Sequence, residues 1–293
     1  MTVDARAEEP VTERRLAASA DLDLRSTREL VELINDEDAT VAGAVRAAAE
    51  PLSRAIDAIV ERLEREGRLV YVGAGTSGRL AAVDASECAP TFGVDPGLVV
   101  ALVADTEALE DDADAGAKAV RSASVGVGDA LVALSAGGRT PYVLGAAAAA
   151  RAVGALTVGV VCAPAAPLGD AVEHAVTVVV GPEVIAGSTR MKAGTAQKLV
   201  LNAISTASMI RLGKTYGNLM VDVVGGNDKL RARARRAVEL ATGAANGEVE
   251  AALAEADGDA KVAIVSLLAG VDAATARERL DRNGGVVRRS LAR

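Results

Sequence analysis

The sequence predicts an α/β fold in which a parallel five-stranded sheet is covered by helices on both faces. Five short, continuous apolar runs recur through the middle of the chain, and helical patterns separate most of them. Such runs are typical of parallel strands, because these strands are buried on both faces. Glycine-rich turns follow the first and third runs directly, and ligands of parallel sheets bind at the carboxyl ends of the strands.

Helices are expected before the sheet. Residues 1–25 are polar and without periodicity, so they are interpreted as an N-terminal arm. Ser26 and Glu29 have the spacing of a capping box, which predicts that a helix begins at Ser26. A second, longer helical pattern covers residues 38–66, and Gly67 is suited to end it.

The apolar runs and the patterns between them predict the order of the remaining elements. The expected strands are 69–72, 98–103, 130–134, 156–161 and 176–180, and the expected helices between them are 77–88, 105–122 and 140–153. One long helix is expected over 188–212, and four short helices follow from residue 228. The predicted domains are an N-terminal arm with helices (1–50), a central domain that contains the sheet (51–225) and a C-terminal helical subdomain (226–293).

Composition excludes several classes of function. Half of the 293 residues are hydrophobic and a quarter are charged, which is a globular balance, and the formal net charge is -8. A nucleic-acid-binding protein is usually basic, so nucleic acid is not an expected partner. His174 is the single histidine, which excludes multi-histidine metal sites and most Ser-His-Asp hydrolases. Two distant cysteines and the lack of a secretory or membrane-spanning pattern predict a cytoplasmic protein with reduced thiols.

The first glycine-rich turn, Gly73 to Arg79, matches the pattern G-x-G-x-x-G and opens a helix. Backbone N–H groups at such a helix start can bind an anion. A dinucleotide is one candidate ligand, with Asp105 as the acid that binds the ribose, and a tight turn without ligand is another interpretation. The hydroxyls of Thr76 and Ser77 favour a terminal phosphate over a dinucleotide, because they can donate hydrogen bonds to a phosphate monoester. The candidate binding residues are Gly75, Thr76, Ser77, Gly78 and Arg79.

A second turn of this kind, Ser135 to Pro141, also follows a strand and opens a helix. Two anion-binding turns at the strand ends of one sheet fit a single phosphosugar pocket between them. The alternative is that two adjacent glycines, 137 and 138, merely end the strand. The candidate binding residues are Ser135, Gly137, Arg139 and Thr140.

Carboxylates near these turns are candidates for acid–base chemistry. The helix that starts at the first turn ends in the segment Asp84 to Thr91, and a second acidic cluster, Glu107 to Asp112, follows the next strand. Together the two segments could supply an acid and a base. The polar stretch 181–198 opens the long helix and adds Glu183, Ser188 and Lys192 as candidates for substrate binding, with Ser188 as the helix cap. Helix capping and a dimer-facing helix are its alternative roles.

At these stretches the chain resembles the N-acetylmuramic acid 6-phosphate etherase family. The matching segments are Ile34–Asp38, GAGTSGRL at 73–80, DASEC at 84–88, PTFGV at 90–94, GRTPYV at 138–143, STRMKAGTAQKLVLN at 188–202 and GNLMVDV at 217–223. The resemblance implies a sugar-isomerase-type core, related to the glucokinase regulatory protein. It also implies a homodimer that uses no metal or organic cofactor. The implied reaction removes D-lactate from N-acetylmuramic acid 6-phosphate by elimination and then hydration, leaving N-acetylglucosamine 6-phosphate.

The resemblance also implies roles for single residues. Glu87 corresponds to the family's proton donor and Glu110 to its second catalytic glutamate, although the segment before Glu110 is shorter than the family pattern and Glu107 could substitute. Gly137 stands where the family has a serine. These departures keep two alternatives open: a non-catalytic sugar-phosphate-binding regulatory protein, and, on the glycine pattern alone, a nicotinamide-dependent oxidoreductase.

Overall fold

The computed structural model describes residues 10–222 and 228–292. The chain divides into two compact units, the first formed by Met1–Ala85 and Val100–Ile204 and the second by Ser86–Val99 and Ser205–Arg293. The division falls inside two long helices, α4 (Gly75–Phe92) and α9 (Lys192–Arg211). The domain boundaries expected from the sequence stay a prediction.

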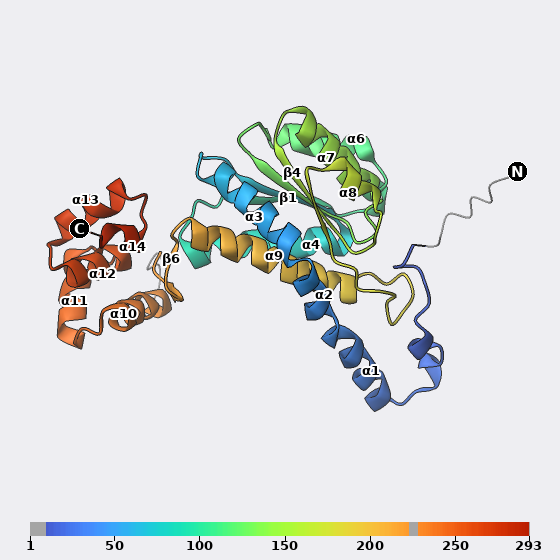
Figure 1. Cartoon of the computed structure of the whole chain (residues 1–293), viewed down its shortest axis with the longest axis horizontal. Coiled ribbons are helices and arrows are strands. Elements are labelled where there is room, and N and C mark those ends of the chain that lie inside the picture. Colours follow the sequence, from blue (N-terminus) through green and yellow to red (C-terminus); the bar gives the residue numbers. More distant parts are fainter. Residues whose placement is uncertain (1–9, 223–227, 293) are drawn as a thin grey trace, which may run out of the picture. The chain divides into compact units, whose positions relative to one another are not determined.

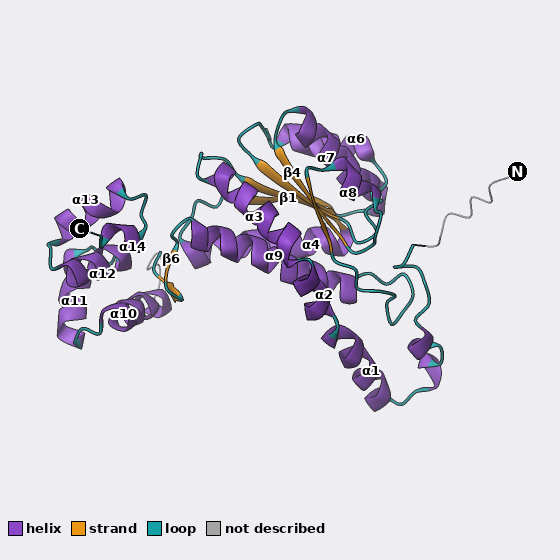
Figure 2. Ribbon diagram, viewed as in Figure 1, coloured by secondary structure: helices purple, strands orange, loops and turns teal. Residues whose placement is uncertain are grey.

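The first unit is built on a five-stranded sheet with the order β2-β1-β3-β4-β5 (Figures 1 and 2). The strands are β1 (Leu69–Ala74), β2 (Val99–Ala104), β3 (Ala130–Leu134), β4 (Leu156–Val161) and β5 (His174–Thr177). β1 pairs in parallel with β3, β3 with β4, and β4 with β5. The predicted α/β fold with a five-stranded sheet is confirmed, and the last strand begins two residues earlier than expected.

Alternate residues of β1 face different helices. Val70 and Val72 belong to a buried cluster with Tyr142 and Val143 of α7 (Pro141–Ala152). Between them, Tyr71 is fully buried and donates a hydrogen bond from its hydroxyl to Asp84 of α4, at 3.0 Å. Because neighbouring side chains of a strand point to opposite faces, α7 and α4 cover different faces of the sheet. Helices therefore lie on both faces, as predicted (Figure 2).

Further helices complete this unit. They are α1 (Thr27–Ala39), α2 (Val41–Ala47), α3 (Ala49–Leu63), α5 (Glu107–Glu110), α6 (Ala113–Ser122) and α8 (Pro167–Ala171). The predicted capping box is present, since Ser26 accepts from the backbone of Glu29 and the Glu29 carboxylate accepts from the backbone of Ser26. The single helix expected over 38–66 is wrong, because it breaks at Ala48 into α2 and α3. Pro51 explains the break: proline is tolerated in a first helical turn but not in a helix interior.

The second unit has its own core. It contains a hairpin of β6 (Thr215–Tyr216) and β7 (Leu219–Met220) and the helices α10 (Asp228–Thr242), α11 (Asn246–Glu255), α12 (Ala260–Ala269), α13 (Ala273–Arg282) and α14 (Val287–Ser290). Val238, Ile264 and Val287 are fully buried in one hydrophobic cluster. The four short helices that the sequence predicts are confirmed, whereas α14 and the hairpin were not expected.

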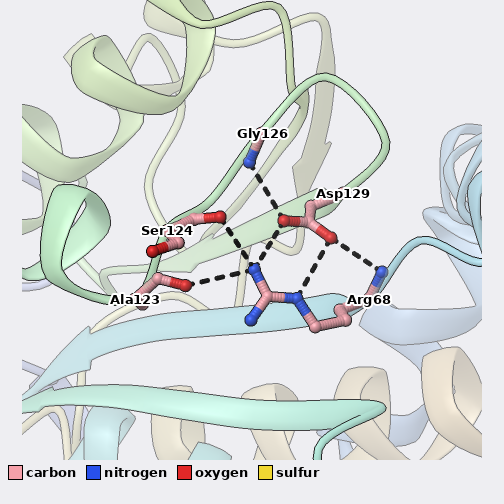
Figure 3. Close-up of polar contacts among 5 residues, drawn as sticks. All are labelled: Arg68, Ala123, Ser124, Gly126 and Asp129. Atoms are coloured by element: carbon pink, nitrogen blue, oxygen red, sulfur yellow. Dashed lines mark hydrogen bonds and ion pairs between the residues drawn. The ribbon is translucent and has the colours of Figure 1, made fainter.

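An ion pair holds together the amino ends of β1 and β3 (Figure 3). Arg68 precedes β1 and Asp129 precedes β3, and their side chains meet at 2.8 Å. Arg68 also donates to the carbonyl oxygens of Ala123 and Ser124, and the Gly126 amide donates to Asp129. Burial alone would raise the pKa of Asp129, but the bonds from Arg68 and the backbone amides hold it below its usual value. The network aligns the strands at the edge opposite to the glycine-rich turns.

Neither cysteine forms a disulfide: Cys88 and Cys162 are both free and buried. Burial raises the pKa of the Cys162 thiol to about 12, so this thiol is protonated at neutral pH. Over residues 10–222 and 228–292, no helix is long and apolar enough to cross a membrane.

Candidate functional site

The two glycine-rich turns meet in one cleft of about 280 Å³ at the carboxyl ends of β1 and β3. Its lining comes from the first turn, the second turn, the end of α5 and the segment before α9. The lining residues are Ala74, Gly75, Thr76, Ser77, Arg79, Glu110, Leu134, Ser135, Ala136, Gly137, Thr140 and Thr189. The cleft thus brings together most of the residues that the sequence singles out in both turns.

The first turn is compact because of its glycines. β1 passes directly into α4, and Gly75 has a positive φ of 52° at the start of the helix. A Cβ atom at Gly78 would lie 2.6 Å from the carbonyl oxygen of Gly73, which is closer than side-chain atoms can come. Gly78 itself is buried and supports the turn from behind. The turn therefore directs the amino end of α4 into the cleft, where its unpaired N–H groups can bind an anion.

Hydroxyl groups line the cleft on both sides. The Ser135 and Thr140 hydroxyls lie 3.0 Å apart, and Arg79 donates to the Thr76 hydroxyl at 3.3 Å. Ser77 donates to the side-chain oxygen of Gln197 in α9, at 2.9 Å. Gln197 is 1% exposed, and its side-chain nitrogen has no hydrogen-bond partner within the described part of the chain. Each of these hydroxyls can donate to a phosphate oxygen once its hydrogen turns from its present partner toward the cleft. Gln197 is a supporting residue that the sequence reasoning did not single out.

Glu110 is the carboxylate that faces this cleft. It ends α5, a short helix capped by the Thr106 hydroxyl, and it is half-buried. A Cβ atom at Gly75 would lie 3.8 Å from a carboxylate oxygen of Glu110, so this carboxylate lies beside the first turn. Glu107, the possible substitute, is exposed and does not line the cleft. A proton acceptor or donor therefore lies next to the predicted phosphate site.

Glu87 lies on the later part of α4, which clusters with the second unit, and its side chain is exposed. Asp84, one turn earlier, is buried and accepts the hydrogen bond from Tyr71. The buried and hydrogen-bonded Asp84 has a structural role, and the exposed Glu87 is available for chemistry. The catalytic role of Glu87 stays a prediction.

The stretch before α9 differs from its predicted form. Ser188 was expected as the helix cap, but α9 begins at Lys192. The fully buried Glu183 carboxylate accepts hydrogen bonds from the amides of Lys192 and Ala193, both at 2.9 Å. Burial raises the pKa of Glu183 and these bonds oppose the rise. Capping by this distant carboxylate, not by a local hydroxyl, sets the start of the helix.

Three predicted binding residues of this stretch lie outside the lining of the cleft: Glu183, Ser188 and Lys192. The Lys192 ammonium is buried and pairs with Glu37 of α1 at 2.5 Å. Thr189, which was not proposed, lines the cleft instead. Lys192 and Glu183 therefore hold the segment that presents Thr189, and their direct contact with substrate stays a prediction.

The cleft offers backbone and hydroxyl donors, the Arg79 cation and one carboxylate. This combination can hold a phosphate monoester and move a proton on the attached chain. Within the described residues, no group of three or more histidine, cysteine or acidic side chains could hold a metal ion.

An α/β unit with two hydroxyl-bearing glycine turns at neighbouring strand ends fits a sugar-phosphate-binding protein of the sugar isomerase class. The SIS domain model matches residues 34–162. Among solved structures, the chain is similar to the phosphoheptose isomerase GmhA from Neisseria gonorrhoeae, with a TM-score of 0.51, 20% identity, and coverage of 62% of this chain and 98% of that one. A putative sugar-phosphate isomerase from Listeria monocytogenes gives a TM-score of 0.50 at 18% identity, over 65% of this chain and 94% of that one. These similarities confirm the predicted sugar-isomerase-type fold.

The chain belongs to the N-acetylmuramic acid 6-phosphate etherase family. A relative of this name from Rubrobacter xylanophilus is 57% identical over 99% of this chain and 98% of its own length. Relatives of the same name from Streptomyces avermitilis and Escherichia coli are 50% and 47% identical and cover 99% and 97% of this chain, and 96% and 98% of their own lengths. The predicted family is confirmed, and these relatives favour an enzyme over the regulatory-protein alternative.

Proposed function

We propose that this protein cleaves the D-lactyl ether of N-acetylmuramic acid 6-phosphate, giving N-acetylglucosamine 6-phosphate and D-lactate. The observation that carries the proposal is the position of Glu110 beside the glycine turns of one cleft, in a chain that matches etherases over almost its whole length. A phosphate held by the turns would leave the sugar chain within reach of that carboxylate.

The reaction follows from the chemistry of the open-chain sugar. Its aldehyde makes the proton on C2 acidic, so a base can remove that proton. The electron pair left on C2 forms a C2–C3 double bond, and the C3–oxygen bond breaks as an acid gives the leaving lactate oxygen a proton. Water then adds across the double bond, with its hydroxyl on C3 and a proton on C2. The sum is one water consumed and no net oxidation.

The turns of the cleft would bind the phosphate through the amino end of α4 and the hydroxyls of Thr76 and Ser77. Glu110 and Glu87 are the proposed acid–base pair, Glu110 on its place in the cleft and Glu87 on the family resemblance. General acid–base catalysis of this kind contributes roughly 10²–10⁴-fold to a rate. The proposed assembly is a homodimer in the cytoplasm with the site near the subunit boundary.

The route is tested by running the reaction in water that carries both deuterium and a heavy oxygen isotope. The sugar product is then analysed by mass spectrometry and NMR. Elimination followed by hydration predicts one solvent deuterium at C2 and a C3 oxygen that comes from labelled water. A product that keeps its original C2 proton would contradict the elimination. No product from folded protein would contradict the proposed function itself.

A further inference from the structure

The amino end of α9 packs against the first glycine turn. A Cβ atom at Gly194 of this helix would lie 3.7 Å from the Thr76 side chain and 3.9 Å from that of Leu80, which is ordinary van der Waals contact. Ala193 and Ala196 are fully buried on either side of Gly194. The turn and this part of α9 belong to the first unit. A side chain of α9 can therefore reach the residues of the turn that line the cleft.

Gln197 is the side chain of α9 that reaches the turn. It is the only glutamine of the chain, and it is 1% exposed. Its side-chain oxygen accepts a hydrogen bond from the Ser77 hydroxyl at 2.9 Å. Its side-chain nitrogen is buried and has no hydrogen-bond partner among the described residues. Because a buried N–H donor without a partner is costly, this orientation of the amide carries a penalty.

The bond to Gln197 sets the direction of the Ser77 hydrogen. A serine hydroxyl has one hydrogen, and in Ser77 it points to the amide oxygen of Gln197. The Ser77 side chain lines the cleft, so it meets a ligand there with the lone pairs of its oxygen. In this state Ser77 can accept a hydrogen bond from a ligand but cannot donate one.

Half a turn of the amide about its last bond would exchange the places of its oxygen and nitrogen. The nitrogen would then donate to the Ser77 oxygen, and the Ser77 hydrogen would be free for an acceptor in the cleft. The amide oxygen would become the unpaired atom, and buried carbonyl oxygens are left without a full set of partners more often than N–H groups are. Each orientation leaves one atom of the amide unpaired. One hydrogen bond from Ser77 to a ligand would therefore favour the turned state.

We propose that Gln197 is a positioning residue whose amide turns when a ligand enters the cleft, so that Ser77 becomes a hydrogen-bond donor to that ligand. The inference rests on the proposed function, from which it takes a sugar phosphate as the ligand. It holds whichever turn binds the phosphate, because any acceptor oxygen beside Ser77, on the phosphate or on the sugar, selects the turned amide. Gln197 acts through Ser77, since Gln197 is not among the residues that line the cleft.

The single glutamine makes the amide directly observable. Protein labelled with nitrogen-15 in glutamine side chains alone gives one pair of amide proton signals in NMR. Saturation with N-acetylglucosamine 6-phosphate is expected to move one of the two signals downfield, because that proton gains the Ser77 oxygen as its acceptor. In Ser77→Ala the pair should move far less, with calorimetry confirming that the sugar is bound. Inorganic phosphate as a second probe moves the signal only if the phosphate is what Ser77 meets.

Gln197→Glu tests the same step through affinity. An ionised carboxylate has no donor, so it keeps the Ser77 hydrogen. The variant should weaken binding of N-acetylglucosamine 6-phosphate by on the order of 3- to 100-fold, the range for a lost hydrogen bond, with the largest losses for a charged acceptor. A protonated carboxyl can donate as the amide does, and burial favours that form, so the loss should grow from about pH 7 to about pH 9.

Two further variants separate positioning from charge. In the Ser77→Ala background, Gln197→Glu should cost little more, because no hydroxyl is left to hold. Asn202→Asp is the matched control, since it also replaces an amide by a carboxylate, at an exposed position of α9, and it should leave the affinity unchanged.

An amide signal that stays in place while the sugar is bound would overturn the proposal. An equal loss for Gln197→Glu with and without the Ser77 hydroxyl would also overturn it, because charge alone would then explain the loss. The proposed function fails in a different measurement, the absence of lactate release from N-acetylmuramic acid 6-phosphate. A sugar phosphate that binds without release of lactate and still moves the amide signal would support the positioning role. Folded protein that binds neither sugar nor phosphate would overturn both.

Discussion

At the scale of single residues, two neighbouring glutamates of one short helix have different surroundings. Glu110 faces the first glycine turn, whereas Glu107 is exposed outside the cleft. Proximity in sequence therefore does not make them equivalent, and the reaction should separate them.

Glu110→Gln is expected to lower kcat by roughly 10²-fold or more, the usual scale for a lost general acid or base, with a much smaller change in KM. Glu107→Gln is the matched control and should retain the wild-type rate. Steady-state assays of lactate release measure both. A large loss in the Glu107 variant with none in the Glu110 variant would reverse the assignment.

Asp129 carries a pH-dependent part of the stability. Its pKa is lowered in the folded protein, so the stabilisation is fully present above the unfolded pKa, near 4, and is lost as the pH falls through the lower folded value. Asp129→Asn should cost about 1–3 kcal/mol at pH 7, since partly buried donors lose their charged acceptor, and the difference from wild type should shrink below about pH 4.

Urea unfolding at several pH values measures this difference. Asp57→Asn, at an exposed position of α3, is the control and should change little. A penalty for Asp129→Asn that persists unchanged into acid would mean that its charge is not the cause.

At the scale of the elements, two adjacent glycines of the second turn differ in the space that a side chain would find there. Gly138→Ala forces a side chain into the left-handed region and against Ala166, which should cost about 1–3 kcal/mol and disturb the second turn. Gly137→Ala meets open space and should be nearly neutral for stability. Thermal unfolding of the pair checks this, and equal effects would contradict the packing described for the turn.

Much of the arrangement of strands and turns could be predicted from the sequence, because the signals for these elements are local. The apolar runs predict the strands, and the two glycine turns predict a shared cleft, because parallel strands end at the same edge. The start of α9 could not be predicted, since its cap is Glu183, which reaches the helix across a folded loop. Gln197 meets the site from a distant segment, and Thr189 lines it from the loop before α9. Their roles depend on tertiary contacts that leave no local pattern.

At the scale of the whole molecule, each of the two units has a hydrophobic core of its own among the described residues. Ile264→Ala in the second core and Leu131→Ala in the first should each cost about 2–5 kcal/mol, because both side chains are fully buried. Hydrogen exchange followed by mass spectrometry should show faster exchange mainly in the unit that carries the substitution. Equal loss of protection across both units would mean that they unfold as one.

The most direct measurement is D-lactate release from N-acetylmuramic acid 6-phosphate by the purified protein, with Glu87→Gln in parallel. Lactate from the wild type, with release lowered by roughly 10²-fold or more in the variant, is the predicted result. This single result would support the family assignment, the cleft as the active site and Glu87 as the proton donor. A folded wild type that binds the phosphosugar and releases no lactate would contradict the proposed enzyme, and equal release by both proteins would contradict the role of Glu87.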